Sequence, residues 1–338
     1  MPIAAQTTPP IGATPGQNAE ELLARLDAAA GDGGEQAAPA RASPAGGSST
    51  LELDCIGAGE TIEHVGTVLV RGKVEAQASV SVVGDLVVEG LIEDANLIVS
   101  GDLFAAGGIK GRDRATLKVG GSLEARFLDS IRGEVAQRAV VERETINCRL
   151  TVHGSFDAGS GSLISGAYTI GRQVSLGSLG SSSAAAVRLK LGAVPLLEPL
   201  LREMDPLIEQ LEKQKSMFKP ELDRLNMPGQ RLNPAQKERQ TELGFSMHTV
   251  ETLLSRCLLA QDDARQRIRR LRTVDLTISG ALHPGVVIEC EGVALRLRNA
   301  VQGPLKIGRD PKGNLILRRA GEQSAIPLSR LAEVLPGS

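Results

Sequence analysis

Aromatic residues are almost absent from this 338-residue chain, which has no Trp, one Tyr and five Phe. Sugar-binding and nucleobase-binding proteins rely on aromatic stacking platforms, and a chain with so few rings is poorly equipped to build them. Charge of either sign is not in excess, because 38 basic residues face 40 acidic ones. The sequence thus lacks the signature of polyanion binding, and we expect no nucleic acid partner. The core must be filled by Val, Ile, Leu and Ala.

Cysteine is scarce and scattered, and no C-x-x-C pair occurs, so neither a zinc site nor a disulfide framework is predicted. The histidines are equally dispersed and form no catalytic or metal-binding motif, and we expect no metal and no cofactor. No run of about 18 apolar residues and no basic leader with an apolar core is present. We therefore expect a cytoplasmic protein without membrane insertion. The residues concerned are Cys55, Cys148, Cys257 and Cys290, and His64, His153, His248 and His283.

A short sequence motif repeats between Val65 and Leu179. It consists of alternating β-branched residues, a turn glycine and another short apolar strand. Period-2 alternation predicts strands, and a unit with no room for a helix must stack on copies of itself. The chain therefore has a mainly β fold class, a parallel β-helix (β-solenoid) of about six or seven rungs. We interpret the repeated glycines as structural turns at which a Cβ would not fit. They are Gly84, Gly101, Gly121 and Gly154, and the gap before Gly154 holds a degenerate copy near 135–141.

Two carboxylates occupy equivalent places on adjacent rungs, Asp85 and Asp102. At a rung spacing of about 5 Å they could serve acid/base chemistry or hold a cation. We favour a role in the turn, because Asp satisfies turns and the next rung has Ser122 at this place. We accordingly predict no catalytic centre.

After residue 192 the apolar period changes from 2 to 3.5. Two heptad seams follow, over 197–225 and 243–271, and a helix break separates them. Asn233 and Pro234 supply an N-cap and a first helical position for the second helix. The sequence thus predicts an inserted antiparallel helical hairpin, a coiled coil over 193–272 whose outward positions are mostly charged. Its first helix should be irregular, because prolines remove backbone donors at Pro199, Pro206 and Pro220.

The composition divides the chain into five parts. Residues 1–50 are rich in Ala, Pro, Gly and Ser and are predicted to be disordered, with one candidate short helix at 19–29. The β-solenoid takes 51–192 and the hairpin 193–272. Alternation then resumes in 273–320, and because a hairpin brings its ends together, these C-terminal return strands should complete the solenoid. Residues 321–338 are expected to form a weakly ordered tail.

A run of arginines near the end of the second helix is the candidate partner-binding feature. It could dock an acidic partner. The alternative is that the cations stabilise the helix C-terminus, by about 0.3–1 kcal/mol each. The run consists of Arg265, Arg267, Arg269, Arg270 and Arg272.

The order of solenoid, helical arm and later strands resembles the flagellar assembly protein A family over residues 51–318. The residues that carry the resemblance are the Gly-Asp-Leu turns, Ser162-Leu163-Ile164-Ser165-Gly166, Leu179-Gly180-Ser181 and Leu282-His283-Pro284-Gly285-Val286. The resemblance implies a structural turn at Pro284 and Gly285. It also implies a non-enzymatic bacterial protein of the cytoplasm, connected with flagellar assembly or polar organisation. The separate N-terminal domain of longer members is missing here.

Three functions fit these features. The first is a scaffold that organises unidentified protein partners, with a homo-oligomer as one arrangement. The alternatives are a β-helix enzyme acting on polysaccharide, which needs export and a carboxylate groove, and a regulatory module that binds a signalling protein through the helical arm. An assay for lyase or hydrolase activity separates the second function from the others.

Overall fold

The computed structural model of the chain describes residues 15–31 and 49–335, apart from 113, 184, 194–196, 228–232, 272, 273, 311 and 323. Two compact units divide these residues. The described residues within 1–38 and 195–270 form a helical unit, and those within 39–194 and 271–338 form a solenoid unit.

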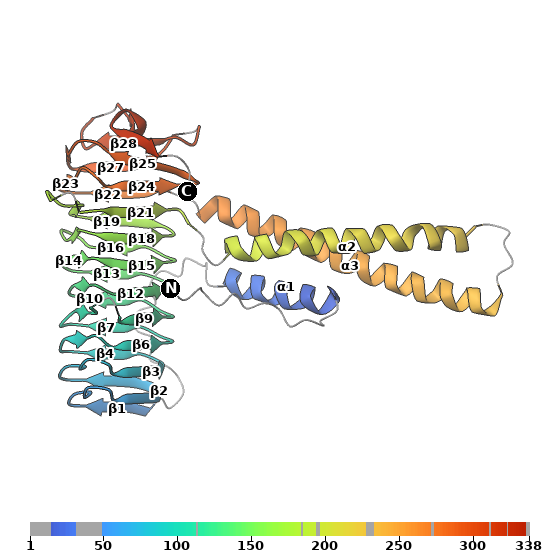
Figure 1. Cartoon of the computed structure of the whole chain (residues 1–338), viewed down its shortest axis with the longest axis horizontal. Helices are drawn as coiled ribbons and strands as arrows, with labels where there is room; N and C mark the ends of the chain where they lie inside the picture. Colours follow the sequence, from blue (N-terminus) through green and yellow to red (C-terminus); the bar gives the residue numbers. More distant parts are fainter. Residues whose placement is uncertain are drawn as a thin grey trace. The chain divides into compact units, whose positions relative to one another are not determined.

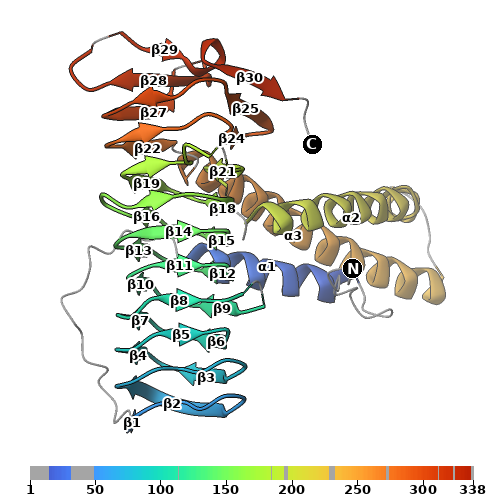
Figure 2. The same ribbon diagram turned by 60° about the vertical axis from the view of Figure 1, so that its left-hand side comes forward.

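The solenoid unit is a parallel β-solenoid of about eight rungs, whose strands stack along one axis (Figures 1 and 2). Each rung lays strands on three faces, because the chain bends at a corner after each strand. The first face holds β1 (Ser49–Leu53), the second half of β2 (Thr61–Val70), β4 (Leu86–Val88), β7 (Leu103–Ala105), β10 (Leu123–Ala125), β13 (Ala139–Val141), β16 (Phe156–Asp157), β19 (Gln173–Leu176) and β22 (Asp275–Ile278).

The second face holds β5 (Ile92–Glu93), β8 (Ile109–Lys110), β11 (Leu128–Asp129), β14 (Glu144–Ile146), β17 (Ser162–Leu163), β20 (Ser178–Leu179) and β23 (Ala281–Leu282). The third face holds the first half of β2, β3 (Ser79–Val83), β6 (Asn96–Val99), β9 (Thr116–Val119), β12 (Arg132–Val135), β15 (Cys148–Val152), β18 (Gly166–Ile170), β21 (Val187–Leu191) and β24 (Val287–Cys290).

The core consists of apolar ladders, because each inward side chain lies on its counterpart in the next rung. On the first face one ladder runs through Val68, Leu86, Leu103, Leu123, Ala139 and Phe156, all of them buried. Burying each large aliphatic side chain contributes roughly 1.5–3 kcal/mol. The degenerate rung near 135–141 takes its place in the stack through β12 and β13 without a turn glycine.

The corner between the second and third faces depends on left-handed backbone at residues other than glycine. Gln77, Asp94, Ser130 and Asn147 have φ values of 65°, 41°, 54° and 51°. Polar residues with short side chains tolerate this conformation better than branched ones do. These four corners have no glycine, although Gly59, Gly180 and Gly285 take the same corner with positive φ in other rungs. The repeated glycines at 84, 101, 121 and 154 therefore mark only the corner between the third and first faces.

The C-terminal strands return antiparallel over the last rung, as the sequence predicts. They are β25 (Val293–Leu297), β26 (Val301–Gln302), β27 (Leu305–Arg309), β28 (Leu315–Arg319), β29 (Ile326–Pro327) and β30 (Ala332–Leu335). β25, β26 and β27 pair with β24, β23 and β22, one on each face. At the opposite end, β1 pairs only with β2 among the residues described.

The expected tail over 321–338 is largely structured instead. β29 pairs with β28 and β30 with β25, and a 3-10 helix, Leu328–Arg330, joins them. Leu328 and Ala332 are buried, so the segment contributes apolar side chains to the core. The solenoid has about eight rungs where six or seven are expected, because β1 at one end and β21 to β24 at the other lie outside 65–179.

The helical unit consists of α1 (Pro15–Gly31), α2 (Leu197–Leu225) and α3 (Pro234–Leu271). α2 and α3 run antiparallel side by side (Figures 1 and 2). The Gln261 side chain donates a hydrogen bond to the Asp205 carboxylate at 2.7 Å, and Lys215 forms an ion pair with Glu251 at 3.0 Å. The Asn233 carboxamide oxygen accepts from the Gln236 N–H at 2.7 Å, and the Gln236 side chain accepts from the Asn233 N–H at 2.9 Å. This reciprocal cap begins α3 at Pro234, as the sequence predicts.

The prolines do not end α2, and the irregularity that they predict stays a prediction. The helix continues from Leu197 to Leu225 with Pro206 and Pro220 inside it. Pro199 lies in the first turn, where its missing N–H has no partner to lose. Apolar contacts of the buried face hold the rest of the helix together.

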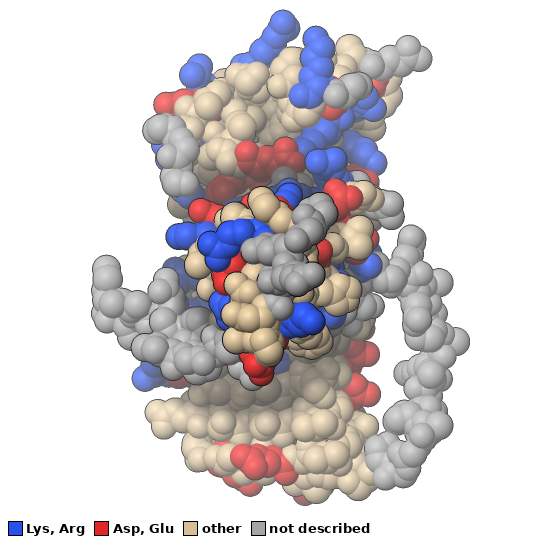
Figure 3. Space-filling model, turned by 90° about the vertical axis from the view of Figure 1, so that its right-hand side faces the viewer, with Lys and Arg blue, Asp and Glu red and all other residues tan. Residues whose placement is uncertain are grey.

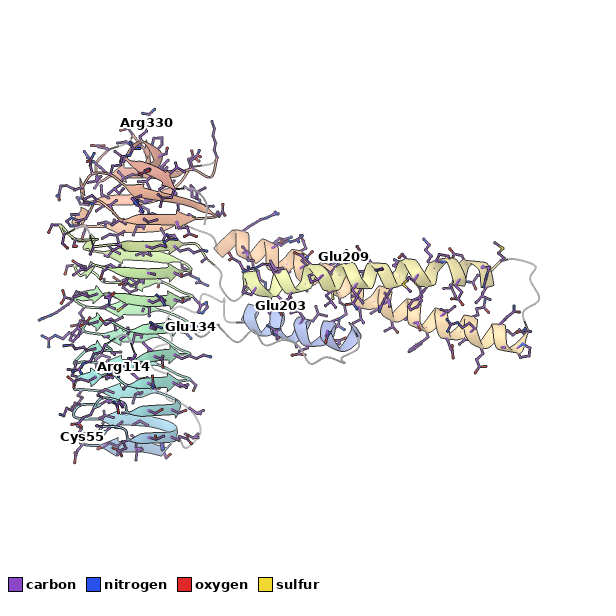
Figure 4. All side chains as sticks on the ribbon, viewed as in Figure 1. Cys55, Arg114, Glu134, Glu203, Glu209 and Arg330 are labelled. Carbon is purple, nitrogen blue, oxygen red and sulfur yellow. The ribbon has the colours of Figure 1, made fainter. Side chains whose placement is uncertain are left out.

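Within residues 1–50, α1 confirms the candidate helix at 19–29, whereas the disorder predicted for 1–14 and 32–48 falls outside the described residues. The α1 side chains Ala19, Leu22, Leu23 and Leu26 are buried within the helical unit. The Arg25 guanidinium pairs with Glu203 of α2 at 2.8 Å (Figure 4), and Glu20 pairs with Arg256 of α3. The apolar side chains of this Ala-rich helix pack within the helical unit, and the composition of the segment alone does not reveal that packing.

The helical unit is inserted at one corner of the solenoid. In the preceding rung Gly171 and Arg172 alone join β18 to β19. In the next rung, Leu191 lies beside Ile170 and Asp275 beside Gln173, and the whole of 192–274 takes the place of that two-residue link.

Candidate functional site

The four predicted turn glycines occupy one corner of the solenoid, between the third and first faces. A Cβ on Gly84 would lie 2.2 Å from the Gly66 carbonyl oxygen, and one on Gly154 would lie 2.0 Å from that of Gln137. On Gly101 and Gly121 it would meet the carboxylates of Asp85 and Asp102 at 2.2 Å. Only Gly84 also has a positive φ, of 146°. Close approach of the preceding rung therefore explains these glycines better than the backbone conformation does.

Asp85 and Asp102 form a ladder beside these glycines. The Asp85 Oδ1 atom accepts from the Asp102 N–H at 2.9 Å, and the Asp102 Oδ1 atom accepts from the Ser122 N–H at 2.7 Å. Each carboxylate thus bridges two rungs through the backbone. The aligned carboxylates are engaged in holding the corner, which fits the structural interpretation.

Pro284 and Gly285 lie in the link between β23 and β24. Gly285 has a φ of 81°, and its N–H donates to the Leu297 carbonyl at 2.9 Å. The adjacent His283 N–H donates to Leu179 at 2.9 Å. The turn therefore belongs to the last parallel rung, and its hydrogen bond to Leu297 joins that rung to the antiparallel strand β25.

Among the described residues of the arginine run, Arg265 and Arg269 are four apart and share one side of α3, whereas Arg267 points to another. Residues two apart on a helix are about 200° apart around its axis, so Arg265 and Arg267 point to nearly opposite sides. Arg265 pairs with Asp205 at 3.4 Å and Arg267 with Asp263 at 2.7 Å, while Arg269 is exposed. The structure describes the backbone but not the side chain of Arg270, and Arg272 lies outside the described residues.

The scattered cysteines and histidines take separate places. Burial raises the pKa of the Cys148 thiol to about 12, and its Sγ atom donates to the Ile146 carbonyl at 3.2 Å. His153 pairs with Glu134 of β12 at 2.7 Å on the third face (Figure 4). Among the residues described, no three His, Cys, Asp or Glu side chains gather as a metal site would require.

A surface that the sequence analysis missed lies on α3, and we call it the outer seam. It consists of Phe245, His248, Thr252, Ser255 and Leu259, whose steps of 3 and 4 place them on one side of the helix. The opposite side carries the buried seam of Leu243, Met247, Val250, Leu254 and Cys257. No residue of the outer seam is Lys, Arg, Asp or Glu, although charged residues such as Lys237, Glu242, Asp262 and Arg265 occupy other exposed positions of α3.

Two large apolar side chains of the outer seam are highly exposed. Phe245 is 74% exposed and Leu259 is 73% exposed, the two highest values for large hydrophobic side chains among the described residues. For comparison, the aromatic side chains of Phe156 and Tyr168 are buried in the solenoid core. The signal that would have found the seam is a second 3-4 spacing on the same helix, with an aromatic residue in a chain that has few.

Positive charge gathers on two parts of the solenoid unit. A hollow of about 390 Å³ on the third face is lined by Arg132 and Arg149 of adjacent rungs, and small residues such as Gly166 and Ala167 contribute to its lining. Neither guanidinium has an ion-pair partner among the described residues, so the pair can hold a carboxylate or phosphate group. Lys and Arg side chains also gather over the C-terminal strands at the top of Figure 3. The exposed ones include Arg296, Arg298, Arg318, Arg319 and Arg330, the last labelled in Figure 4.

No helix within the described part of the chain is both long and apolar enough to cross a membrane. Comparisons with curated proteins and with solved structures give no match. Residues 61–313, however, match the Flagellar Assembly Protein A beta solenoid domain. The matched stretch runs from β2 through the inserted helices to the returning strands. The fold and this match agree, and the chain belongs to the flagellar assembly protein A family.

Proposed function

We propose that the chain is a non-enzymatic scaffold of the bacterial cytoplasm, connected with flagellar assembly or polar organisation. It acts through protein contacts of the helical unit and the solenoid. The family description supports the assembly role. The stack of rungs supports the scaffold role, because backbone hydrogen bonds between rungs make a rigid support from which other parts can be presented.

The observation that carries the proposal is the outer seam of α3. Large exposed apolar side chains at helical spacing are typical of surfaces that receive another helix. Phe245 and Leu259 are exposed on the helical unit, whose core is already filled by the buried seam of α3 and by α1. The seam is therefore available to a partner.

The solenoid supplies a second kind of contact. Arg132 and Arg149 on the third face, and the basic C-terminal strands, suit acidic side chains of a protein partner. Such contacts add specificity and faster association, while the seam supplies apolar burial.

Capture of partners from the native bacterium tests the proposal. Four baits are compared: the whole chain, a chain in which a short glycine linker joins Gly192 to Thr273, the double variant Phe245→Glu, Leu259→Glu, and Met217→Glu. Met217 is 65% exposed on α2, outside the seam, and serves as the matched control. We expect flagellar assembly proteins with the whole chain and with Met217→Glu, and their loss from the other two baits. Equal capture by all four baits would refute the role of the helical unit.

A further inference from the structure

Two arginines of adjacent rungs lie side by side on the third face of the solenoid. β12 and β15 pair in parallel with Arg132 directly beside Arg149, and both side chains are exposed. Aligned residues of neighbouring parallel strands point to the same side, and their strands lie about 4.8 Å apart. Like charges directly opposite each other on a sheet are unfavourable, so this place favours an anion that neutralises both.

The solenoid unit neutralises several of its arginines within the fold, but not these two. Four others pair with a carboxylate of a neighbouring rung, namely Arg71 with Glu52, Arg114 with Asp94, Arg138 with Asp157 and Arg188 with Glu289. Glu134 follows Arg132 by two residues on β12, but it is engaged with His153 at 2.7 Å. Among the described residues neither Arg132 nor Arg149 has an ion-pair partner, and both charges are left for a ligand.

The two arginines line a hollow of about 390 Å³ that no long side chain fills. In the rung after Arg149 the aligned residue is Ala167, and Gly166 lies beside it. Among the described residues that line the hollow there is no Asp, Glu or aromatic side chain. The two positive charges are therefore not offset within the hollow, and a nucleobase finds no ring on which to stack.

The hollow also offers a hydroxyl group. The Ser165 Oγ atom lies in its lining and accepts from the Asn147 N–H at 2.8 Å, so the Ser165 hydroxyl proton is left to donate to a ligand. Cys148 is a lining residue too, but burial raises the pKa of its thiol to about 12, and it brings no negative charge. Two guanidinium groups and a hydroxyl thus face the same space.

A phosphate monoester matches these groups better than a carboxylate does. A carboxylate carries one negative charge and two oxygen atoms, which the fork of a single guanidinium satisfies. A phosphate monoester carries a charge of about −1.5 to −2 at pH 7 and has three terminal oxygen atoms. It can therefore neutralise both arginines and accept from the hydroxyl as well.

We propose that Arg132, Arg149 and Ser165 form a binding site for a phosphate monoester. This inference rests on the proposed function, because it narrows the acidic group that suits the third face to a phosphate monoester. A phosphorylated side chain of a protein partner and a small phosphorylated metabolite both carry this group. The experiment separates these two sources.

Isothermal titration calorimetry of the whole chain tests the class of ligand. The probes are a short peptide with one phosphoserine, the same peptide with glutamate at that position, glycerol 3-phosphate and dimethyl phosphate. At least one of the two monoesters should bind about 10-fold or more tightly than the glutamate peptide and dimethyl phosphate, which each offer a single negative charge. Tighter binding of the phosphopeptide than of glycerol 3-phosphate identifies a protein source, and the reverse identifies a metabolite. Equal binding of all four probes, or binding of neither monoester, would overturn the proposal.

Substitutions test the residues. Arg132→Gln and Arg149→Gln should each weaken monoester binding by about 10- to 100-fold, the loss expected for a hydrogen bond to a charged group, and Ser165→Ala by about 3- to 10-fold. Arg126→Gln is the matched control, because Arg126 is exposed just after β10, at the corner between the first and second faces. It should leave the affinity unchanged. All three arginine variants should melt like the parent chain, because the altered side chains are exposed. Monoester binding that survives Arg149→Gln undiminished would overturn the assignment.

The two proposals fail differently. If neither monoester binds, but the double variant Arg132→Gln, Arg149→Gln loses partners that the whole chain captures, the ligand assignment falls and the scaffold role stands. If a monoester binds as expected, but partner capture is the same for every bait, the scaffold role falls and the phosphate site stands.

Discussion

Replacing Gly154 with alanine should destabilise the solenoid, because the rung below leaves no room for a methyl group. A Cβ would lie 2.0 Å from the Gln137 carbonyl oxygen and 2.7 Å from its carbon. Both are backbone atoms, so no side chain can rotate out of the way. The two rungs must separate by more than about 1 Å at this corner to reach ordinary contact distance.

The magnitude follows from the bonds that this separation strains. Two backbone hydrogen bonds join these two rungs beside the corner: the Ala139 N–H donates to the Ser155 carbonyl and the His153 N–H donates to the Val135 carbonyl, both at 2.9 Å. Weakening both costs about 2 kcal/mol, and overpacking adds about 1–3 kcal/mol. The stiffer unfolded chain of the alanine variant offsets about 0.5–1 kcal/mol. The net loss is about 2–4 kcal/mol, or roughly 4–16 °C in Tm for a domain of this size class.

Thermal melting followed by circular dichroism in the β region measures the effect. Gly57→Ala is the matched control in the same solenoid, because its Cβ would meet only the Glu60 Oε2 atom at 3.4 Å. It should change stability by less than about 0.5 kcal/mol. Gly101→Val should lower Tm by several degrees or more, since its Cβ meets Asp85 at 2.2 Å and the Gly84 carbonyl at 2.8 Å. If Gly154→Ala and Gly101→Val melt like Gly57→Ala, the assigned contact between rungs is wrong.

Three further outcomes are expected. The double variant Asp85→Asn, Asp102→Asn keeps an oxygen acceptor for each backbone N–H, so partner capture should be unchanged; loss of a measurable turnover would instead favour an enzyme. Replacing 193–272 by a short glycine linker should remove the helical circular dichroism signal and keep cooperative melting of the β signal, whereas aggregation would mean that the helical unit protects a sheet edge. A thiol reagent at pH 8 should label Cys55 rapidly and leave Cys148 unlabelled, because burial raises the pKa of the Cys148 thiol to about 12; equal labelling rates would contradict that burial.

The solenoid was largely predictable because its signal is repeated. Alternation like that of β3 and β6 recurs along the stack and the glycine corner recurs in most rungs, so errors at single positions average out. The rung at β12 and β13 lacks the glycine, yet its apolar alternation placed it correctly. Spacing also predicted the helix pair, because a 3.5-residue period and the Asn233 cap are local properties of the chain.

What could not be predicted depends on contacts between distant segments. The sequence predicted the helix α1, but not that it packs against α2 and α3, which follow more than 160 residues later. The corners at Asp94 and Asn147 adopt left-handed backbone without glycine, because the neighbouring rungs fix the path of the chain. The outer seam was missed because a helical face becomes conspicuous only once the other face is known to be buried.

The insertion of the helical unit at a solenoid corner ties the folding of the last rung to that of the helices. If residues 192–274 were an unstructured loop, bringing the two ends of the loop together would cost conformational entropy, and this cost grows with the logarithm of the loop length. Relative to the two-residue link of the preceding rung, this amounts to about 3 kcal/mol. Formation of the antiparallel helices holds the two ends near each other and removes most of that penalty. A partner that stabilises the helices would therefore also stabilise β22 and the strands beyond it, although it touches none of them.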